Sequence, residues 1–130
     1  QVNEIAPRTH NSGHFSIEAC TSSQFDQQVC IAAGLPVPMP EMRSDGALMV
    51  NLLGLNSNQA APLEQRLKEL REIPNAHLHW YGKSPETCGR KLGHVTVLLD
   101  GGDAKHRQQQ AKDALDVIRG IWPEFASQRD

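Results

Sequence analysis

Three stretches of the chain carry the hydrophobic patterns of β-strands. Residues 47–53 form a continuous apolar run broken only by Asn51, which predicts a strand buried on both faces. Residues 77–81 and 94–99 instead alternate between apolar and polar side chains, as strands with one buried face do. A loop of about ten residues separates them, so we expect these two stretches to pair as antiparallel strands.

The N-terminal part predicts one strand and one helix. Residues 2–6 alternate and then stop at a proline, which predicts a strand that leads into a loop. The segment Thr21-Ser22-Ser23-Gln24 has the spacing of a capping box, and the apolar residues after it predict a helix over residues 22–33. Three prolines in residues 35–45 then favour an extended connector.

Two further helices are expected in the C-terminal half. Pro62 suits the first helical position, and the helix would end near Pro74 with one apolar stripe, made of Leu63, Leu67 and Leu70. Asp103 is the expected N-cap of a last helix. The apolar face of that helix would contain Ala111, Ala114, Leu115, Ile118 and either Ile121 or Trp122. Together the elements predict an α+β fold, a small, mostly antiparallel sheet or partial barrel with packed helices.

Composition narrows the class of protein. The 130 residues are 38% hydrophobic and 22% charged, which excludes a disordered or fibrous chain. The net charge of −2 argues against nucleic-acid binding, which needs a basic face, and no apolar stretch is long enough to cross a membrane. The cysteines are odd in number and not closely paired, which argues against a disulfide framework and favours a reducing compartment, so we expect a cytoplasmic protein.

Positive charge is concentrated in two short segments. Residues 8–14 carry a net charge of +1 and residues 83–94 carry +2, so the rest of the chain carries −5. Such a distribution is typical of loops that bind an anion. The alternative is that these cations are simply solvated.

The first of these segments belongs to a dense polar stretch, residues 3–14. Glu4 ends the first predicted strand, where a carboxylate could bind a hard cation such as Mg²⁺. Arg8 could bind phosphate or carboxylate with two parallel hydrogen bonds, and His10, Asn11, Ser12 and His14 follow in a loop. A polar turn with a surface Glu4–Arg8 pair is the alternative. Because such a stretch normally has protein on both sides, we expect a portion of a longer enzyme.

The second segment lies between the two alternating strands. Lys83, Arg90 and Lys91 share this loop with two glycines, so backbone and side-chain donors could converge on a phosphate. The spacing is not that of a Walker P-loop. A solvated basic loop is again the alternative.

Histidines and an asparagine on the predicted strands allow other readings. His77, His79 and His94 could geometrically form a three-ligand zinc site, but no metal-binding spacing supports one. Polar residues alternating on a half-exposed strand face explain these histidines better. Asn51 is expected to be a buried, hydrogen-bonded amide.

Three ordered blocks carry a resemblance to a known family. They are Asn-Glu-Ile-Ala-Pro-Arg-Thr-His-Asn-Ser-Gly-His from residue 3, Met-Val-Asn-Leu-Leu-Gly from residue 49, and His-Trp-Tyr-Gly-Lys from residue 79 followed by Gly-Arg-Lys-Leu-Gly-His-Val from residue 89. The blocks resemble the C-terminal third of 5-(carboxyamino)imidazole ribonucleotide synthases, ATP-grasp ligases of purine biosynthesis. The resemblance assigns residues 1–34 to the end of the ATP-grasp domain and residues 35–130 to a C-terminal α+β domain.

The resemblance implies an activity and a set of site residues. The full-length enzyme would use ATP and Mg²⁺ to activate bicarbonate as carboxyphosphate and carboxylate 5-aminoimidazole ribonucleotide. Glu4 would bind the metal, and Asn3 would lie beside it at the nucleotide. Arg8 and His10 would be catalytic. The residues that would bind the ribonucleotide are His10, Asn11, Ser12, His14, Lys83, Arg90 and Lys91.

The chain departs from the family pattern at two places. Thr9 replaces a usual proline, and Thr87-Cys88 stands where Arg-Pro is usual, which removes a cation near the expected phosphate. Within the superfamily, formate-dependent glycinamide ribonucleotide transformylase is the alternative, and a non-catalytic ligand-binding or interaction module is another. The resemblance also implies a homodimer, and a 130-residue portion that is inactive alone. The edge strand at residues 2–6 would be mobile or mispaired without its neighbours.

Overall fold

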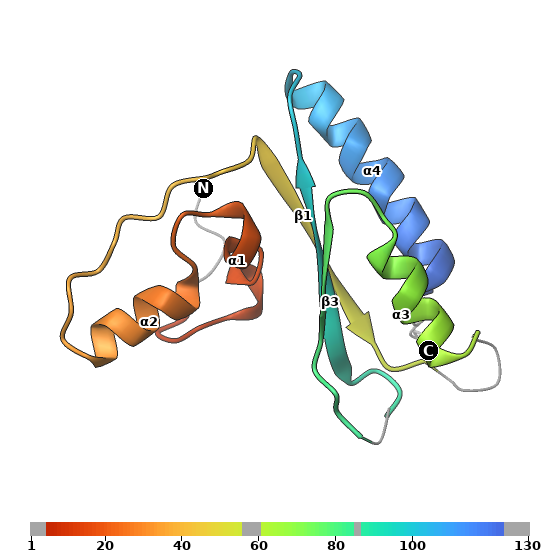
Figure 1. Ribbon diagram of the computed structural model, residues 1–130, viewed down its shortest axis with the longest axis horizontal. Coiled ribbons are helices and arrows are strands. Elements are labelled where there is room, and N and C mark those ends of the chain that lie inside the picture. The colour runs from red at the N-terminus through yellow and green to blue at the C-terminus, as the bar shows by residue number, and fades with distance from the viewer. Residues whose placement is uncertain (1–4, 56–60, 85–86, 124–130) are drawn as a thin grey trace.

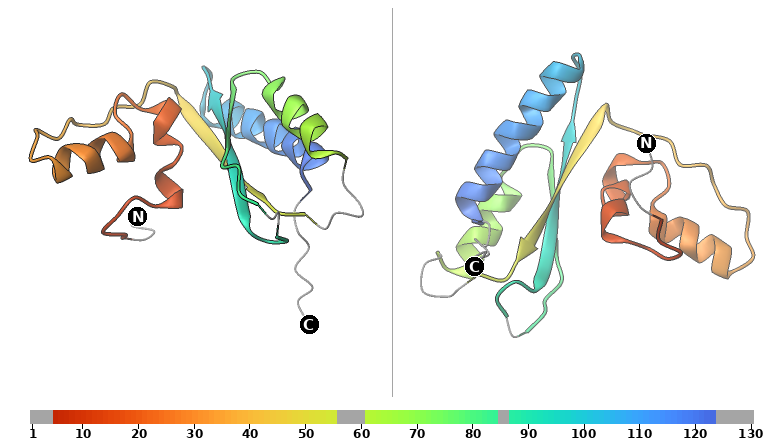
Figure 2. Two further views of the ribbon diagram at one scale, coloured as in Figure 1. Left: turned by 60° about the horizontal axis from the view of Figure 1, so that its bottom comes forward. Right: turned by 180° about the vertical axis from the view of Figure 1, so that it is seen from behind.

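The computed structural model describes residues 5–55, 61–84 and 87–123, and these form three layers (Figure 1). A three-stranded sheet stands in the middle. Two helices cover one face of the sheet, and the N-terminal segment lies against the other (Figure 2). The α+β class is confirmed, with an open sheet rather than a barrel. Within the described ranges, no helix has the length and apolar character needed to span a membrane.

The sheet is antiparallel and has the order β1-β3-β2, with β1 at Gly46–Leu53, β2 at Ala76–Trp80 and β3 at Lys91–Leu99. The expected pairing of the two alternating strands is confirmed. The expectation that the apolar run is buried on both faces is wrong, because β1 is an edge strand and only half-buried. The central strand is β3, whose side chains are almost all buried. An apolar run indicates that a strand is at least partly buried. It does not indicate whether the strand is central or at the edge of the sheet, which depends on the order of the strands.

Alternate residues of the sheet build the hydrophobic core with α3 (Leu63–Arg71) and α4 (Ala104–Ile121). The predicted leucine stripe and the Asp103 N-cap are both confirmed. Trp122 follows α4, is fully buried, and donates from its indole N–H to the carbonyl of Leu53 at 2.7 Å. The core residues are Val50, Leu52, Leu67, Leu70, Leu92, Val95, Val97, Leu99, Ile118 and Trp122.

The N-terminal segment contains a 3₁₀ turn, η1 (Asn11–Gly13), and two helices, α1 (Ser16–Ala19) and α2 (Gln24–Ala32). The capping box exists, but it starts two residues later than predicted, at Ser23 with Asp26 as its partner. The short α1 was not predicted, because four residues carry too little helical periodicity to detect. The predicted strand over residues 2–6 falls partly outside the described residues, and residues 5 and 6 have no strand structure.

Helix α2 and the connector after it expose several large apolar side chains. The helix buries none of its residues, and Phe25, Val29 and Ile31 are 39%, 64% and 62% exposed. The connector, residues 35–45, is extended as expected and adds exposed side chains such as Met39. The helical spacing of residues 22–33 therefore marks an apolar surface that the described chain leaves uncovered.

Candidate functional site

The N-terminal loop, residues 8–14, is held by the side chain of Gln24. The amide oxygen accepts from the backbone N–H of His10 at 2.8 Å, and the amide nitrogen donates to the carbonyl of the same residue at 2.8 Å. That nitrogen also lies 2.8 Å from Nδ1 of His14. Because the His10 backbone fixes which end of the amide is oxygen, Nδ1 of His14 is the acceptor. Sequence reasoning missed this role of Gln24.

The predicted site residues of this loop occupy one turn. The ring of His10 caps η1, with its Nδ1 3.3 Å from the backbone nitrogen and 2.9 Å from the hydroxyl of Ser12. Asn11 begins η1. Arg8 is exposed, and its guanidinium donates to the carbonyl of Thr9 at 3.1 Å. Asn3 and Glu4 lie outside the described residues, so their assignments stay predictions.

The sheet face toward the N-terminal segment is polar, and we call it the polar face. It carries Asn51, His79, His94 and Thr96. Asn51 and His79 both stand opposite His94 in the register, and Thr96 is two positions from His94 on the same strand. The rings of His79 and His94 are stacked, with centroids 4.5 Å apart and planes 13° apart. Glu18 from α1 reaches this face and pairs with Nε2 of His79 at 2.5 Å. This contact joins the N-terminal segment to β2.

His94 is at the centre of the polar face and is only 2% exposed. Burial, together with the charges that His79 and His14 can carry, lowers the pKa of His94 to about 4. The imidazole is therefore neutral at pH 7 and has one acceptor nitrogen. The hydroxyl of Tyr81 lies 2.7 Å from Nδ1 of His94, and burial raises the pKa of Tyr81, so the hydroxyl keeps its proton and donates it.

The basic loop, residues 83–91, follows Tyr81 and is anchored by Gly54 at the end of β1. The N–H of Gly54 donates to the carbonyl of Arg90 at 2.8 Å, and the carbonyl of Gly54 accepts from Gly89 at 2.9 Å. A Cβ on Gly54 would lie 2.1 Å from the carbonyl oxygen of Thr87, so only glycine allows this approach. The described part of the loop thus has a fixed backbone.

The three predicted cations of the basic loop are exposed. The ammonium of Lys83 donates to the carbonyl of Lys91 at 3.2 Å and lies 5.0 Å from the centroid of the Tyr81 ring. Among the residues that the structure describes, no carboxylate forms an ion pair with Lys83 or Lys91. Their positive charge is therefore available to a ligand.

The N-terminal loop and the basic loop are linked through residues of the polar face. The ring of His14 packs on that of His94 with centroids 4.9 Å apart. The pKa of His14 is lowered by burial and then by the positive charge of Lys91, followed by His79 and His10. Two segments that sequence analysis singled out separately therefore form one region, with Tyr81, His94, His79 and Glu18 as additional members that it did not assign.

Two expectations about this face need correction. His94 is fully buried rather than on a half-exposed face, whereas His77 is exposed and His79 half-buried, as expected. The rings of His79 and His94 stack instead of converging on a point, and the described residues contain no group of three metal-binding side chains. Asn51 is half-buried, but its Oδ1 is enclosed without a hydrogen-bond partner in the described chain, contrary to expectation.

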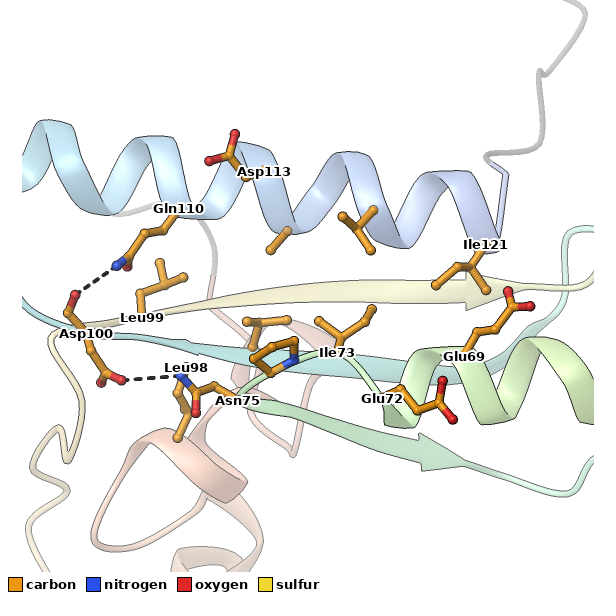
Figure 3. Close-up of a pocket in the computed structure, with 14 residues that line it drawn as sticks. Glu69, Glu72, Ile73, Asn75, Leu98, Leu99, Asp100, Gln110, Asp113 and Ile121 are labelled. Carbon is orange, nitrogen blue, oxygen red and sulfur yellow. Dashed lines mark hydrogen bonds between the residues drawn. The ribbon is translucent and has the colours of Figure 1, made fainter.

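A separate cavity of about 550 Å³ lies on the other side of the sheet, between α3 and α4 (Figure 3). Its floor is apolar, with Ile73, Leu99 and Ile121, and its rim carries only acidic charges. The acidic residues are Glu69, Glu72, Asp100 and Asp113. None of the predicted site residues lines this cavity, and its charge is opposite to that expected of a phosphate site.

Two protein-family models match the chain, one near its N-terminus and one in its C-terminal part. Residues 47–109 match the phosphoribosylaminoimidazole carboxylase C-terminal domain, and residues 1–25 match the ATP-grasp domain. The two matches fall on opposite sides of the expected division between residues 34 and 35. The position of that division stays a prediction.

Individual proteins are similar over most of the chain. The N5-carboxyaminoimidazole ribonucleotide synthase of Synechococcus elongatus is 50% identical over 122 residues, which is 94% of this chain and 31% of that protein. The N5-carboxyaminoimidazole ribonucleotide synthetase structure from Thermus thermophilus has a TM-score of 0.74 and 35% identity, covering 95% of this chain and 30% of its own.

A structure from Aspergillus clavatus links the fold to ligands. It is an N5-carboxyaminoimidazole synthase in complex with ADP and 5-aminoimidazole ribonucleotide, with a TM-score of 0.70 and 36% identity, covering 91% of this chain and 31% of its own. The chain thus spans about a third of the length of the relatives it matches. In sequence and in fold, the chain is similar to the C-terminal portion of N5-carboxyaminoimidazole ribonucleotide synthases.

Proposed function

We propose that the chain is part of an ATP-dependent ligase that carboxylates 5-aminoimidazole ribonucleotide with bicarbonate, through carboxyphosphate, in purine biosynthesis. The observation that carries the proposal is the series of contacts that joins the two loops across the polar face. The ring of His14 packs on that of His94, and Tyr81, which is hydrogen-bonded to His94, lies against Lys83 of the basic loop. A ribonucleotide has a phosphate at one end and a base at the other, so its site needs cations and a polar base-binding loop side by side. The names of the relatives favour this activity over glycinamide ribonucleotide transformylation.

The exposed cations of the basic loop would bind the substrate phosphate. Lys83, Arg90 and Lys91 can each donate hydrogen bonds to phosphate oxygens, and the guanidinium of Arg90 can do so with two bonds. The fixed backbone at Gly54 supports this role, because it reduces the conformational entropy that binding would otherwise cost. Thr87 stands where relatives usually have a cation, so these three residues would carry the phosphate without it.

The N-terminal loop would face the aminoimidazole ring and the reacting phosphoryl group. His10, Asn11, Ser12 and His14 offer short polar side chains on a turn that Gln24 holds in place. Arg8 is exposed in the same loop and would stabilise the anionic carboxyphosphate. His10, two residues further along the chain, could hold or transfer a proton.

Nucleotide and metal binding would involve the residues before this loop. Asn3 and Glu4 are the candidates, with Glu4 as a carboxylate ligand of Mg²⁺, which would neutralise charge between phosphates when bound. The described residues contain no group of three metal-binding side chains, so the other ligands would come from outside them. We also propose a homodimer located in the cytoplasm, which sedimentation of the full-length protein and cell fractionation would test.

Hydrolysis of ATP by the full-length protein tests the function. We expect phosphate release to rise when 5-aminoimidazole ribonucleotide and bicarbonate are both present, and Glu4→Gln to lower that rate strongly. We expect Arg90→Ala to raise the KM for the ribonucleotide by about tenfold, the loss of one charged hydrogen bond. Arg71→Ala, at an exposed position at the end of α3, is the matched control. A protein that released phosphate at the same rate without ribonucleotide would contradict the proposal.

A further inference from the structure

One buried side chain, His94, links the two loops. Its ring packs against His14, with centroids 4.9 Å apart, and against His79, with centroids 4.5 Å apart. Its Nδ1 accepts a hydrogen bond from the hydroxyl of Tyr81 at 2.7 Å. The ring of Tyr81 in turn lies 5.0 Å from the ammonium of Lys83. Direct contacts therefore run from the N-terminal loop to the basic loop through His94.

The residues around His94 are not those expected if the region served only to stabilise the fold. Several buried side-chain polar atoms on or beside the polar face lack a hydrogen-bond partner among the described residues, namely Glu18 Oε2, Asn51 Oδ1, His94 Nε2 and Thr96 Oγ1. Apolar side chains of similar size would avoid the cost of burying such groups without a partner. Local arrangements that lower stability occur mainly where binding or catalysis requires them.

His94 makes two kinds of contact, ring packing with His14 and His79 and a hydrogen bond with Tyr81, and the two kinds have different consequences. The His79 ring stacks on His94 and the His14 ring packs on it at a tilt, so both contacts are between ring surfaces. The polar atoms of these two residues bond elsewhere, to Glu18 and Gln24 respectively. The hydrogen bond to Tyr81 instead fixes one direction, because the hydroxyl must point at Nδ1. That bond orients the aromatic ring on which Lys83 lies.

We propose that His94 is a positioning residue for the ribonucleotide: it orients Tyr81, and through it Lys83, at a fixed spacing from His14. The inference rests on the proposed function, in which Lys83 binds the phosphate and the N-terminal loop faces the base. A ligand that touches both loops binds well only when their spacing matches its length. The proposal therefore predicts an effect on the affinity for the ribonucleotide and none on the affinity for ATP.

The test uses steady-state kinetics of the full-length enzyme. Tyr81→Phe removes only the hydroxyl of a half-exposed side chain, so folding should survive. We expect it to raise the KM for 5-aminoimidazole ribonucleotide by about fivefold, the loss of one neutral hydrogen bond, with the KM for ATP unchanged. His94→Gln keeps an acceptor and should raise that KM less than His94→Leu, which keeps none. His77→Gln, exposed on the same face of β2, is the control.

The outcomes separate this inference from the proposed function. If Tyr81→Phe leaves the ribonucleotide KM unchanged while Arg90→Ala raises it, the positioning role is wrong and the proposed function stands. A parallel rise in both KM values and a fall in kcat would show a general structural defect and would also overturn the inference. If the unmodified enzyme shows no response to the ribonucleotide, the proposed function fails first, and the inference fails with it.

Discussion

Acidification should destabilise the fold through His94. This side chain is enclosed between the strands and the N-terminal segment, with the rings of His79 and His14 against it. Protonation in the folded state would place a positive charge beside two other imidazoles and remove the acceptor that Tyr81 uses. In the unfolded chain the same imidazole takes up a proton freely. The unfolded state therefore gains protons as pH falls, and the folded state resists them.

The size of the effect follows from the pKa. The pKa of His94 falls from 6.5 to about 4 on folding, and one pKa unit corresponds to ~1.4 kcal/mol, which gives on the order of 3 kcal/mol. This contribution is complete above pH 6.5 and is lost as pH falls toward 4. His14, whose pKa is also lowered, acts in the same direction. Hydrogen bonds with Ser23 lower the pKa of Asp26 below its ordinary value of 3.8, so Asp26 titrates below this pH range.

Urea unfolding of the 130-residue chain between about pH 7 and pH 4.5 measures the effect. Trp80 and Trp122 are the two tryptophans of the sequence, and their rings lie 5.8 Å apart beside the core, so their fluorescence reports its loss. We expect the free energy of unfolding to fall by about 2 kcal/mol or more over this range. His94→Gln removes the titrating group and keeps an acceptor, so its curve should be much flatter.

A matched variant separates His94 from general acid effects. His77 lies on the same face of β2 but is exposed, so His77→Gln should keep the pH dependence of the unmodified chain. If His94→Gln lost stability with the same slope as the unmodified chain, the linkage of His94 to folding would be refuted. A flat curve for the unmodified chain would refute it equally.

Three further substitutions test other parts of the structure. Leu70→Ala in the fully buried core should lower the free energy of unfolding by about 2–5 kcal/mol in the same urea assay. Ser23→Ala removes the N-cap acceptor for the backbone N–H of Asp26, so amide hydrogen exchange in α2 should become faster by about fivefold, for a cap worth about 1 kcal/mol. Gly54→Ala would force a Cβ to within 2.1 Å of the Thr87 carbonyl, so it should displace the basic loop and raise the ribonucleotide KM of the full-length enzyme.

Sequence patterns predicted the elements of the fold well where the pattern depends on local spacing. The leucine stripe of α3 and the Asp103 cap of α4 follow from residues a few positions apart. The pairing of β2 with β3 follows from the alternation within each strand and the short loop between them. The burial of β1 was predicted wrongly, because the position of a strand within a sheet depends on distant segments. Local periodicity carries no information about those segments.

The candidate site was predicted only in part for the same reason. The charged and polar loops were recognisable from residue type, but the side chains that join them come from far apart in the sequence. Glu18 and His79 are 61 positions apart, and Gln24 acts on His10 across 14 positions. His94 lies in an ordinary alternating strand, and only the register that places Asn51 and His79 beside it reveals its role.

The unlike faces of the sheet also constrain how the chain can misfold. A slip of β2 by one residue along β3 would turn every side chain of β2 over. His77 and His79 would then enter the leucine-rich core, and Trp80 would leave its place beside Trp122 for the imidazoles. Both changes are unfavourable, so the shifted register is destabilised on both faces of the sheet. His77 and His79, which add little to the core of the native state, therefore favour the native register of β2 over the shifted one.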